Sequence, residues 1–142
     1  MATIASIRPL ALVAITTSLV SGHCLITSDL ERLQRERMFS HAYLDTWSLD
    51  HHKAIGDDPA NLGWPDDGNG RYTRSLGYYD WYWLNISKRI YLNDIEHLAY
   101  VLPCTIVSAF VHPYISSGLL FTYLIGRTLY RDGYLEREGA FN

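Results

Sequence analysis

Two sets of side chains in the second half of the chain are spaced so that each could line one face of an α-helix, because residues three or four apart share a face. The sets are Arg89, Asn93, Glu96 and Tyr100, and Tyr123, Arg127, Tyr130 and Tyr134. Guanidinium groups bind carboxylates, a glutamate can pair with an ammonium group, and tyrosine hydroxyls donate directional hydrogen bonds. The two faces therefore predict a pocket for a small zwitterionic or anionic ligand.

A purely structural interpretation of these residues is equally consistent with their spacing. Ionisable side chains at membrane depth are costly, and they turn inward to pair with one another or to bind a ligand. Glu96 would then pair with Arg127 or Arg89 only to neutralise its own charge. Both interpretations require two helices that approach each other where these residues lie.

The elements that would carry these faces follow from the distribution of charge. The chain has 142 residues, 48% of them hydrophobic, and a net charge of −3, which on average resembles one soluble domain. Its charges are concentrated, however, because residues 9–28 and 97–126 contain no Asp, Glu, Lys or Arg. About 20 apolar residues suffice to cross ~30 Å of hydrocarbon, so residues 9–28 predict a transmembrane helix. A cleaved signal peptide and a buried helix of a soluble protein are the alternatives.

The second uncharged block is too long for one span and contains Pro113, which would end a helix. It predicts a hairpin of two transmembrane helices, over about residues 84–111 and 114–134, each extended into its charged flank to reach full length. The fold class expected is all-α: an integral membrane bundle of three transmembrane helices in a single domain, residues 1–142. A polar, aromatic-rich loop over about residues 39–82 would join the first two helices.

The central loop contains three of the four tryptophans of the chain and many of its acids, and Trp83 follows it directly. Aromatic rings of this kind favour the headgroup layer of a membrane, and an acidic chain without a basic stripe argues against a nucleic-acid partner. The acids around Asp66 lack the alternating ligands of a calcium loop, and the adjacent His51 and His52 have the wrong spacing for zinc, so no metal site is predicted. Cys24 and Cys104 are expected to be small buried hydrophobic residues.

The sequence RIYLNDIE, followed by the hairpin and by IGRTLYRDGY, resembles the MAPEG family. These are the membrane-associated proteins in eicosanoid and glutathione metabolism, which include the microsomal glutathione transferases. The family pattern has Arg-x-x-x-Asn-x-x-Glu on one helix and Arg-x-x-Tyr-x-x-Gly-Tyr on the next, and both motifs are present. The resemblance covers residues 63–134.

This resemblance implies a four-helix protomer, assembly as a homotrimer and glutathione bound between protomers. Transferred position by position, the implied glutathione-binding residues are Arg89, Asn93, Glu96, Arg127, Tyr130 and Tyr134. The chain departs from the family because Phe141 stands where members place an arginine that stabilises the glutathione thiolate, with Arg137 as the nearest substitute. It is also expected to lack the fourth helix. A thiol without a nearby cation stays protonated and is a poor nucleophile.

These departures favour a catalytically degenerate protein that acts as an accessory or structural subunit of a larger membrane protein complex, with other membrane subunits and lipids as partners. A mitochondrial membrane, such as that of the respiratory chain, is favoured over the endoplasmic reticulum. The alternative is an enzyme, a microsomal-type glutathione S-transferase or peroxidase acting on lipophilic electrophiles or lipid hydroperoxides, in which Arg137 replaces the missing arginine. Glutathione is the expected cofactor if the ancestral pocket is retained, and no catalytic residue is assigned.

Overall fold

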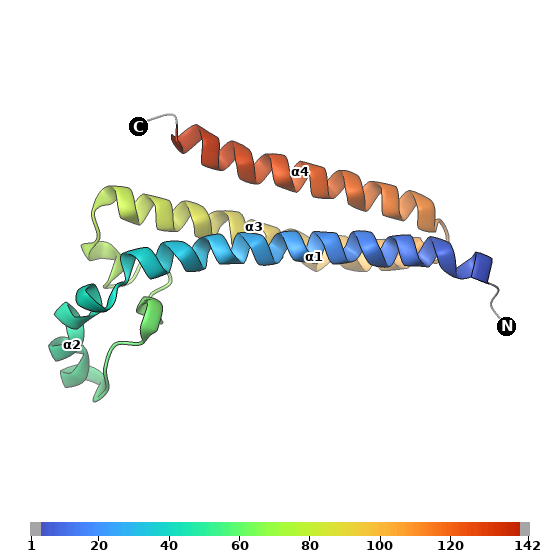
Figure 1. Cartoon of the computed structure of the whole chain (residues 1–142). Helices are drawn as coiled ribbons and strands as arrows, with labels where there is room; N and C mark the ends of the chain where they lie inside the picture. Colours follow the sequence, from blue (N-terminus) through green and yellow to red (C-terminus); the bar gives the residue numbers. More distant parts are fainter. Residues whose placement is uncertain (1–3, 140–142) are drawn as a thin grey trace. The chain divides into compact units, whose positions relative to one another are not determined.

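A computed structural model describes residues 4–139 of the protein, with side chains for residues 8–136 (Figure 1). Over this range the chain is all-helical, which confirms the predicted class, and no strand occurs in it. The α-helices are α1 (Ile4–Met38), α2 (His41–Ile55), α3 (Tyr78–Ala109) and α4 (Pro113–Gly139), and two 3₁₀ turns are η1 (Asn61–Gly63) and η2 (Thr73–Ser75).

The residues group into two compact units, where the sequence analysis expects one domain. The hairpin unit comprises Met1–Thr27 with Ile90–Asn142, and the loop unit comprises Ser28–Arg89. Helices α1 and α3 each contribute residues to both units.

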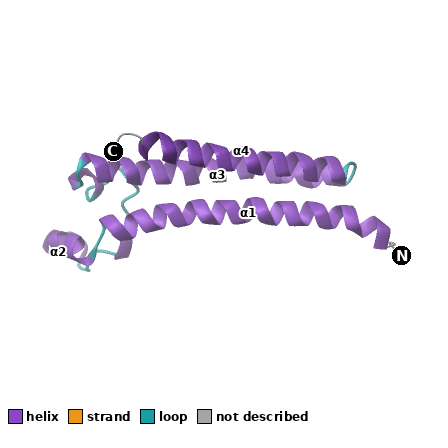
Figure 2. Cartoon of the chain, turned by 45° about the horizontal axis from the view of Figure 1, so that its top comes forward, coloured by secondary structure: helices purple, strands orange, loops and turns teal. Residues whose placement is uncertain are grey.

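In the hairpin unit, α3 and α4 run antiparallel, and the start of α1 lies at the same end as the turn between them (Figures 1 and 2). The predicted hairpin is present: α3 ends at Ala109, and Pro113 begins α4, a position where its missing N–H costs no hydrogen bond. Small polar side chains join the helices near this end. Ser108 Oγ lies 2.8 Å from Ser116 Oγ, and Thr16 Oγ1 lies 3.4 Å from Ser117 Oγ.

Among the described helices, α1 alone is long and apolar enough to cross a membrane, over Arg8–Met38. Its most apolar stretch is 28% buried, whereas the core helix of a soluble protein would be mostly buried. Charged side chains within the predicted second and third spans, such as Asp94 and Arg127, lower the hydropathy of α3 and α4. A single helix of this kind fits a membrane span by length and composition, as a signal sequence also would, so the bundle of three spans remains a prediction.

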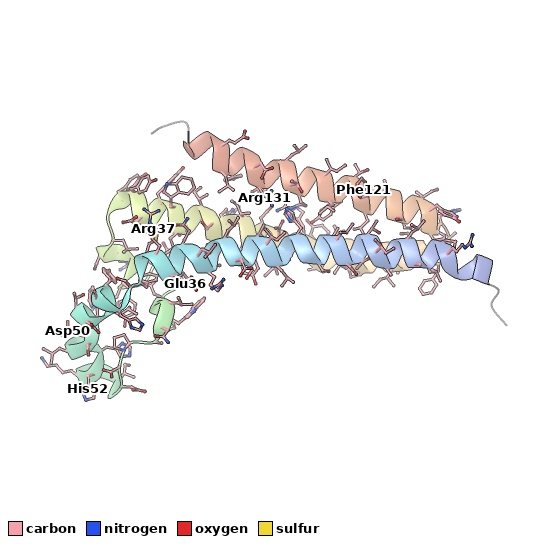
Figure 3. All side chains as sticks on the ribbon, in the orientation of Figure 1. Glu36, Arg37, Asp50, His52, Phe121 and Arg131 are labelled. Atoms are coloured by element: carbon pink, nitrogen blue, oxygen red, sulfur yellow. The ribbon has the colours of Figure 1, made fainter. Side chains whose placement is uncertain are left out.

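The outward faces of the hairpin unit are strongly apolar. Val107 of α3 and Phe110 in the turn that follows it are 70% and 80% exposed, and Leu119 and Leu129 of α4 are each 67% exposed. Phe121 also projects from α4, on the same helix as the charged Arg131 (Figure 3). Soluble monomers rarely expose apolar surface on this scale, and such surfaces mark sites of contact with other proteins or with membranes.

The loop unit contains a helix that the sequence analysis did not predict. Residues 39–82 are expected to form a loop, but His41–Ile55 is helical. Ser40 caps the start of α2, because its Oγ accepts a hydrogen bond from Tyr43 N at 3.4 Å. Gly56 ends the helix in the left-handed conformation, with φ of 87°, which glycine adopts without strain.

A small aromatic core holds the loop unit together. Phe39 and Leu44 pack against Tyr72 from the central loop and Leu84 from the start of α3, and all four are buried. Trp47 of α2 meets Tyr72 edge to face, with ring centroids 5.6 Å apart. Trp47, for which the sequence predicts a place at a membrane surface, thus packs against this core.

Candidate functional site

A buried ion pair joins α3 to α4 in the hairpin unit. Arg127 Nε donates to Asp94 Oδ1 at 2.6 Å, and Arg127 Nη1 donates to Asn93 Oδ1 at 2.7 Å. Asp94 is 2% exposed and Arg127 is 8% exposed. Hydrogen bonds between ionised partners are about twice as strong as neutral ones, and neither charge can be left alone in a dry interior.

Helix α1 supplies two further side chains to the same carboxylate. Thr27 Oγ1 donates to Asp94 Oδ2 at 2.8 Å, and His23 Nδ1 lies 3.3 Å from that oxygen. His23 and Thr27 are four residues apart, so they lie on one face of α1. Asp94 is therefore the point at which all three helices of the hairpin unit are joined, and we call these residues with Arg127 and Asn93 the Asp94 cluster.

The space left at the Asp94 cluster is small. A cavity of about 10 Å³ is lined in part by His23, Asp94, Tyr123 and Arg127, which is room for about one water molecule. Within the described residues, His23 Nε2 and Arg127 Nη2 have no aligned hydrogen-bond partner, although Nη2 lies 2.5 Å from Asp94 Oδ1. Pockets for small organic ligands measure about 300–1,000 Å³, so this cavity is too small for a tripeptide.

The structure brings together four of the six residues that the MAPEG resemblance implies. Asn93 and Arg127 are directly bonded. The Arg127 guanidinium lies over the Tyr130 ring, 4.6 Å from its centroid, and the Tyr130 and Tyr134 rings are 4.8 Å apart. The expected face of α4 is therefore continuous, with Arg127 at its buried end.

The other two, Arg89 and Glu96, are both exposed. Arg89 belongs to the loop unit and Glu96 to the hairpin unit. The interpretation in which Glu96 neutralises Arg127 is wrong, because Asp94 occupies that place. The side chain of Arg137, the expected substitute cation, lies outside the described residues, as does Phe141.

Sequence reasoning missed Asp94, His23 and Thr27. Arg89, Asn93 and Glu96 share one face of α3 by their spacing, whereas Asp94 is rotated about 100° from Asn93, onto the face that packs inward. The signal that could have identified the cluster was on α1. His23 and Thr27 are polar residues at helical spacing within an otherwise apolar predicted span, and such residues usually face a partner inside the bundle.

A second polar centre lies in the loop unit, around the carboxylate of Asp66. This carboxylate accepts hydrogen bonds from Gly68 N at 3.0 Å, Gly70 N at 2.8 Å, Thr73 N at 2.8 Å and Thr73 Oγ1 at 2.9 Å. Burial raises the pKa of Asp66, but the hydrogen bonds from Thr73, Gly70 and Gly68 outweigh burial, so the pKa lies below its ordinary value. A side chain at position 70 would collide with the carboxylate, because a Cβ there would lie 2.4 Å from the Asp66 carboxyl carbon.

Both oxygens of the Asp66 carboxylate accept hydrogen bonds from protein groups, so the turn does not present a free carboxylate oxygen to a metal ion. Residues 8–136, whose side chains the structure describes, contain no group of three or more His, Cys, Asp or Glu placed to hold a metal ion. The carboxylate instead organises the backbone between Asp66 and Thr73.

Arg35 of α1 fixes the start of this loop. Its Nη1 donates to Leu62 O at 2.9 Å, and its Nη2 donates to Asp66 O at 2.5 Å. The guanidinium lies 3.8 Å from the centroid of the Trp64 ring, and Glu31 Oε1 accepts from Nε at 3.2 Å. Arg35 is 1% exposed, so its hydrogen bonds to Leu62 and Asp66 and its contact with the Trp64 ring are all buried.

Replacing Arg35 with lysine should loosen the central loop even though the charge is kept. Lysine cannot make two directed bonds to Leu62 and Asp66 while stacking on Trp64, and we expect a loss of about 2 kcal/mol in the local stability of residues 56–77. Hydrogen exchange of the loop amides measures this loss. Arg37→Lys is the matched control, because Arg37 is exposed and its nearest acid, Asp80, is 3.9 Å away. Equal effects from both variants would contradict the assignment.

No protein-family model matches the chain, and no curated protein or solved structure matches it.

Proposed function

We propose that this chain is a MAPEG-like membrane protein without turnover, which serves as an accessory subunit of a larger membrane protein complex. The observation that carries the proposal is the set of hydrogen bonds that Arg127 makes within the chain. The residue that the resemblance implies for glutathione is bonded to Asp94 and Asn93 inside the bundle. A glutathione carboxylate could reach it only by replacing Asp94, which would leave that carboxylate buried and unpaired.

The outer surface of α4 supports a partner helix. Gly118, Thr122 and Gly126 recur every four residues and are all exposed. A Cβ added at either glycine would meet no atom within 4 Å. Small residues at this spacing let two helix backbones approach closely in a membrane, and the apolar side chains around them would face lipid or the partner.

The enzyme remains the second candidate, because one observation favours it. Arg89 and Glu96 are exposed, and Tyr100 is 54% exposed, so these side chains of α3 are free to contribute to a site between protomers. Such a site would have to bind glutathione with Arg127 still held by Asp94, or to separate that pair. The accessory function requires neither glutathione binding nor separation of the Arg127–Asp94 pair.

The particle mass in native membranes distinguishes the two candidates. We expect the protein, extracted in a mild detergent, to migrate with a multi-protein assembly on native gels and in light scattering. Migration as a homotrimer of the 16.3 kDa chain would contradict the accessory function and favour the enzyme.

Association should depend on the small residues of α4. Gly118→Leu combined with Gly126→Leu should release the protein from the assembly while leaving its helix content unchanged, because a Cβ added at either position meets no atom of this chain within 4 Å. Gly22→Leu on α1 is the control, since its Cβ would also meet no atom within 4 Å. Retention of the double variant in the assembly would show that another surface makes the contact.

A further inference from the structure

The loop unit contains a cavity of ligand size that has no part in the Asp94 cluster. Its volume is about 320 Å³, within the range of pockets that hold small organic molecules. One wall is the second half of α2, and the other is the loop on either side of the Asp66 turn. Its lining includes Trp47, Asp50, His51, Asp66, Arg71 and Tyr72.

The aromatic wall of this cavity is held in a fixed arrangement. The Trp47 and Tyr72 rings meet edge to face at 5.6 Å, and the His51 ring stacks on Tyr72 with centroids 6.5 Å apart. Tyr72 OH lies 2.8 Å from His51 Nδ1, and its backbone carbonyl accepts from Tyr43 OH at 2.6 Å. The π faces are therefore ordered before any ligand arrives, which lowers the entropy lost on binding.

The electrostatics of the cavity favour a cation. Asp66 is 7% exposed, and within the described residues no ion pair neutralises its carboxylate. Its hydrogen bonds come from neutral groups and favour the charged form. Asp50 adds a second carboxylate, and Ala54 and Ile55, at the negative end of the α2 dipole, also line the cavity.

Arg71 is the basic residue of the lining, and its side chain is exposed. No ion pair with Asp50 or Asp66 occupies it within the described part of the chain. An exposed guanidinium on a flexible stem suits a phosphate. The cavity thus combines aromatic faces and carboxylates for a cation with one guanidinium for an anion.

We propose that this cavity binds a phosphocholine group, with the quaternary ammonium against the Trp47 ring, which Tyr72 holds in place, and the phosphate at Arg71. Aromatic faces attract quaternary ammonium ions through the ring quadrupole, and the carboxylates of Asp50 and Asp66 add to that attraction. The same chemistry is offered by free phosphocholine and by the headgroup of a choline phospholipid. The proposal does not depend on the accessory function or on the MAPEG resemblance.

The test is a calorimetric titration of the full chain in a maltoside detergent, which carries no choline. Choline, phosphocholine, inorganic phosphate and dihexanoylphosphatidylcholine below its micelle concentration are the titrants. We expect saturable binding of phosphocholine, weaker binding of choline and none of phosphate. Tighter binding of the short-chain lipid than of phosphocholine would identify a lipid as the source, and equal binding would identify the free headgroup.

Two variants of exposed lining residues assign the roles. Asp50→Asn should weaken choline and phosphocholine by roughly tenfold, the loss expected when a charged pair is removed. Arg71→Gln should weaken phosphocholine by a similar factor and leave choline unchanged. The controls are Asp45→Asn on the same helix and Arg74→Gln in the same loop; both residues are exposed and lie outside the lining.

Three results would overturn the proposal. These are the absence of saturable phosphocholine binding, phosphate binding as tight as that of phosphocholine, or equal losses in the lining variants and their controls. Because Asp50 and Arg71 are exposed, the variants should fold, and circular dichroism of each checks this directly.

Discussion

Replacing Asp94 with alanine should destabilise the hairpin unit by about 3–5 kcal/mol, because the change leaves the Arg127 charge buried without its partner. The loss is large because three helices meet at this carboxylate. Arg127 donates from α4, and Thr27 and His23 contribute from α1. Thermal unfolding in detergent, followed by circular dichroism, measures the effect.

A second variant distinguishes the net contribution of the ion pair to stability from the destabilisation caused by leaving one buried charge without its partner. Asp94→Leu combined with Arg127→Met removes both charges, and buried ion pairs replaced by apolar residues are often neutral in stability. Thr27 Oγ1 keeps its bond to Cys24 O at 3.0 Å, so that hydroxyl is not left unpaired. The double variant should therefore recover most of the stability that Asp94→Ala loses.

Glu96→Ala is the matched control for Asp94, two residues along the same helix. Glu96 is exposed, and surface changes of this kind are usually within about 0.5 kcal/mol of neutral. If Glu96→Ala destabilised the protein as much as Asp94→Ala, the ion pair would be between Arg127 and Glu96, as one sequence interpretation proposed.

The loop unit should lose stability in acid through Asp66. The folded-state pKa of this carboxyl is lowered by its hydrogen bonds, so its contribution is fully present above the unfolded-state value, about 3.9. That contribution is lost as pH falls through the folded-state pKa. We therefore expect the aromatic core around Tyr72 to loosen below about pH 4, as measured by near-ultraviolet circular dichroism.

Asp66→Asn should remove that part of the acid transition and lower stability at neutral pH by about 3 kcal/mol, because an amide NH₂ cannot accept the bonds that the second carboxylate oxygen accepts. Asp67→Asn is the control. Asp67 is adjacent and pairs with Lys88 at 2.5 Å, but its side chain is 73% exposed. An acid transition that persists unchanged in Asp66→Asn, or that disappears in Asp67→Asn, would contradict the assignment.

The helices that carry the Asp94 cluster could be predicted from charge distribution. Two uncharged blocks and Pro113 were sufficient to place a long first helix and a hairpin, because these signals are local in the sequence. Helix α2 was missed because Gly, Pro and Asp further along the loop dominated the interpretation of that region. Its Ser40 cap and Gly56 stop are signals that could have identified it.

The candidate sites were less predictable, because they depend on which faces meet. The motif arginine at position 127 was identified, but its partner depends on the rotation of α3 and on the register of α1, which spacing along one helix does not specify. The phosphocholine cavity depends on the path of the loop around Asp66. That path is determined by contacts of Arg35 with residues 27 and 31 positions away, and no short motif encodes them.

The central claim is that Arg127 holds the helices together and is not available to glutathione. Calorimetric titration of the full chain, purified from native membranes, with glutathione tests it most directly. The account predicts no saturable heat of binding at millimolar glutathione. Saturable binding that Arg127→Met abolishes would contradict the account, because it would mean that Arg127 leaves Asp94 to bind the tripeptide.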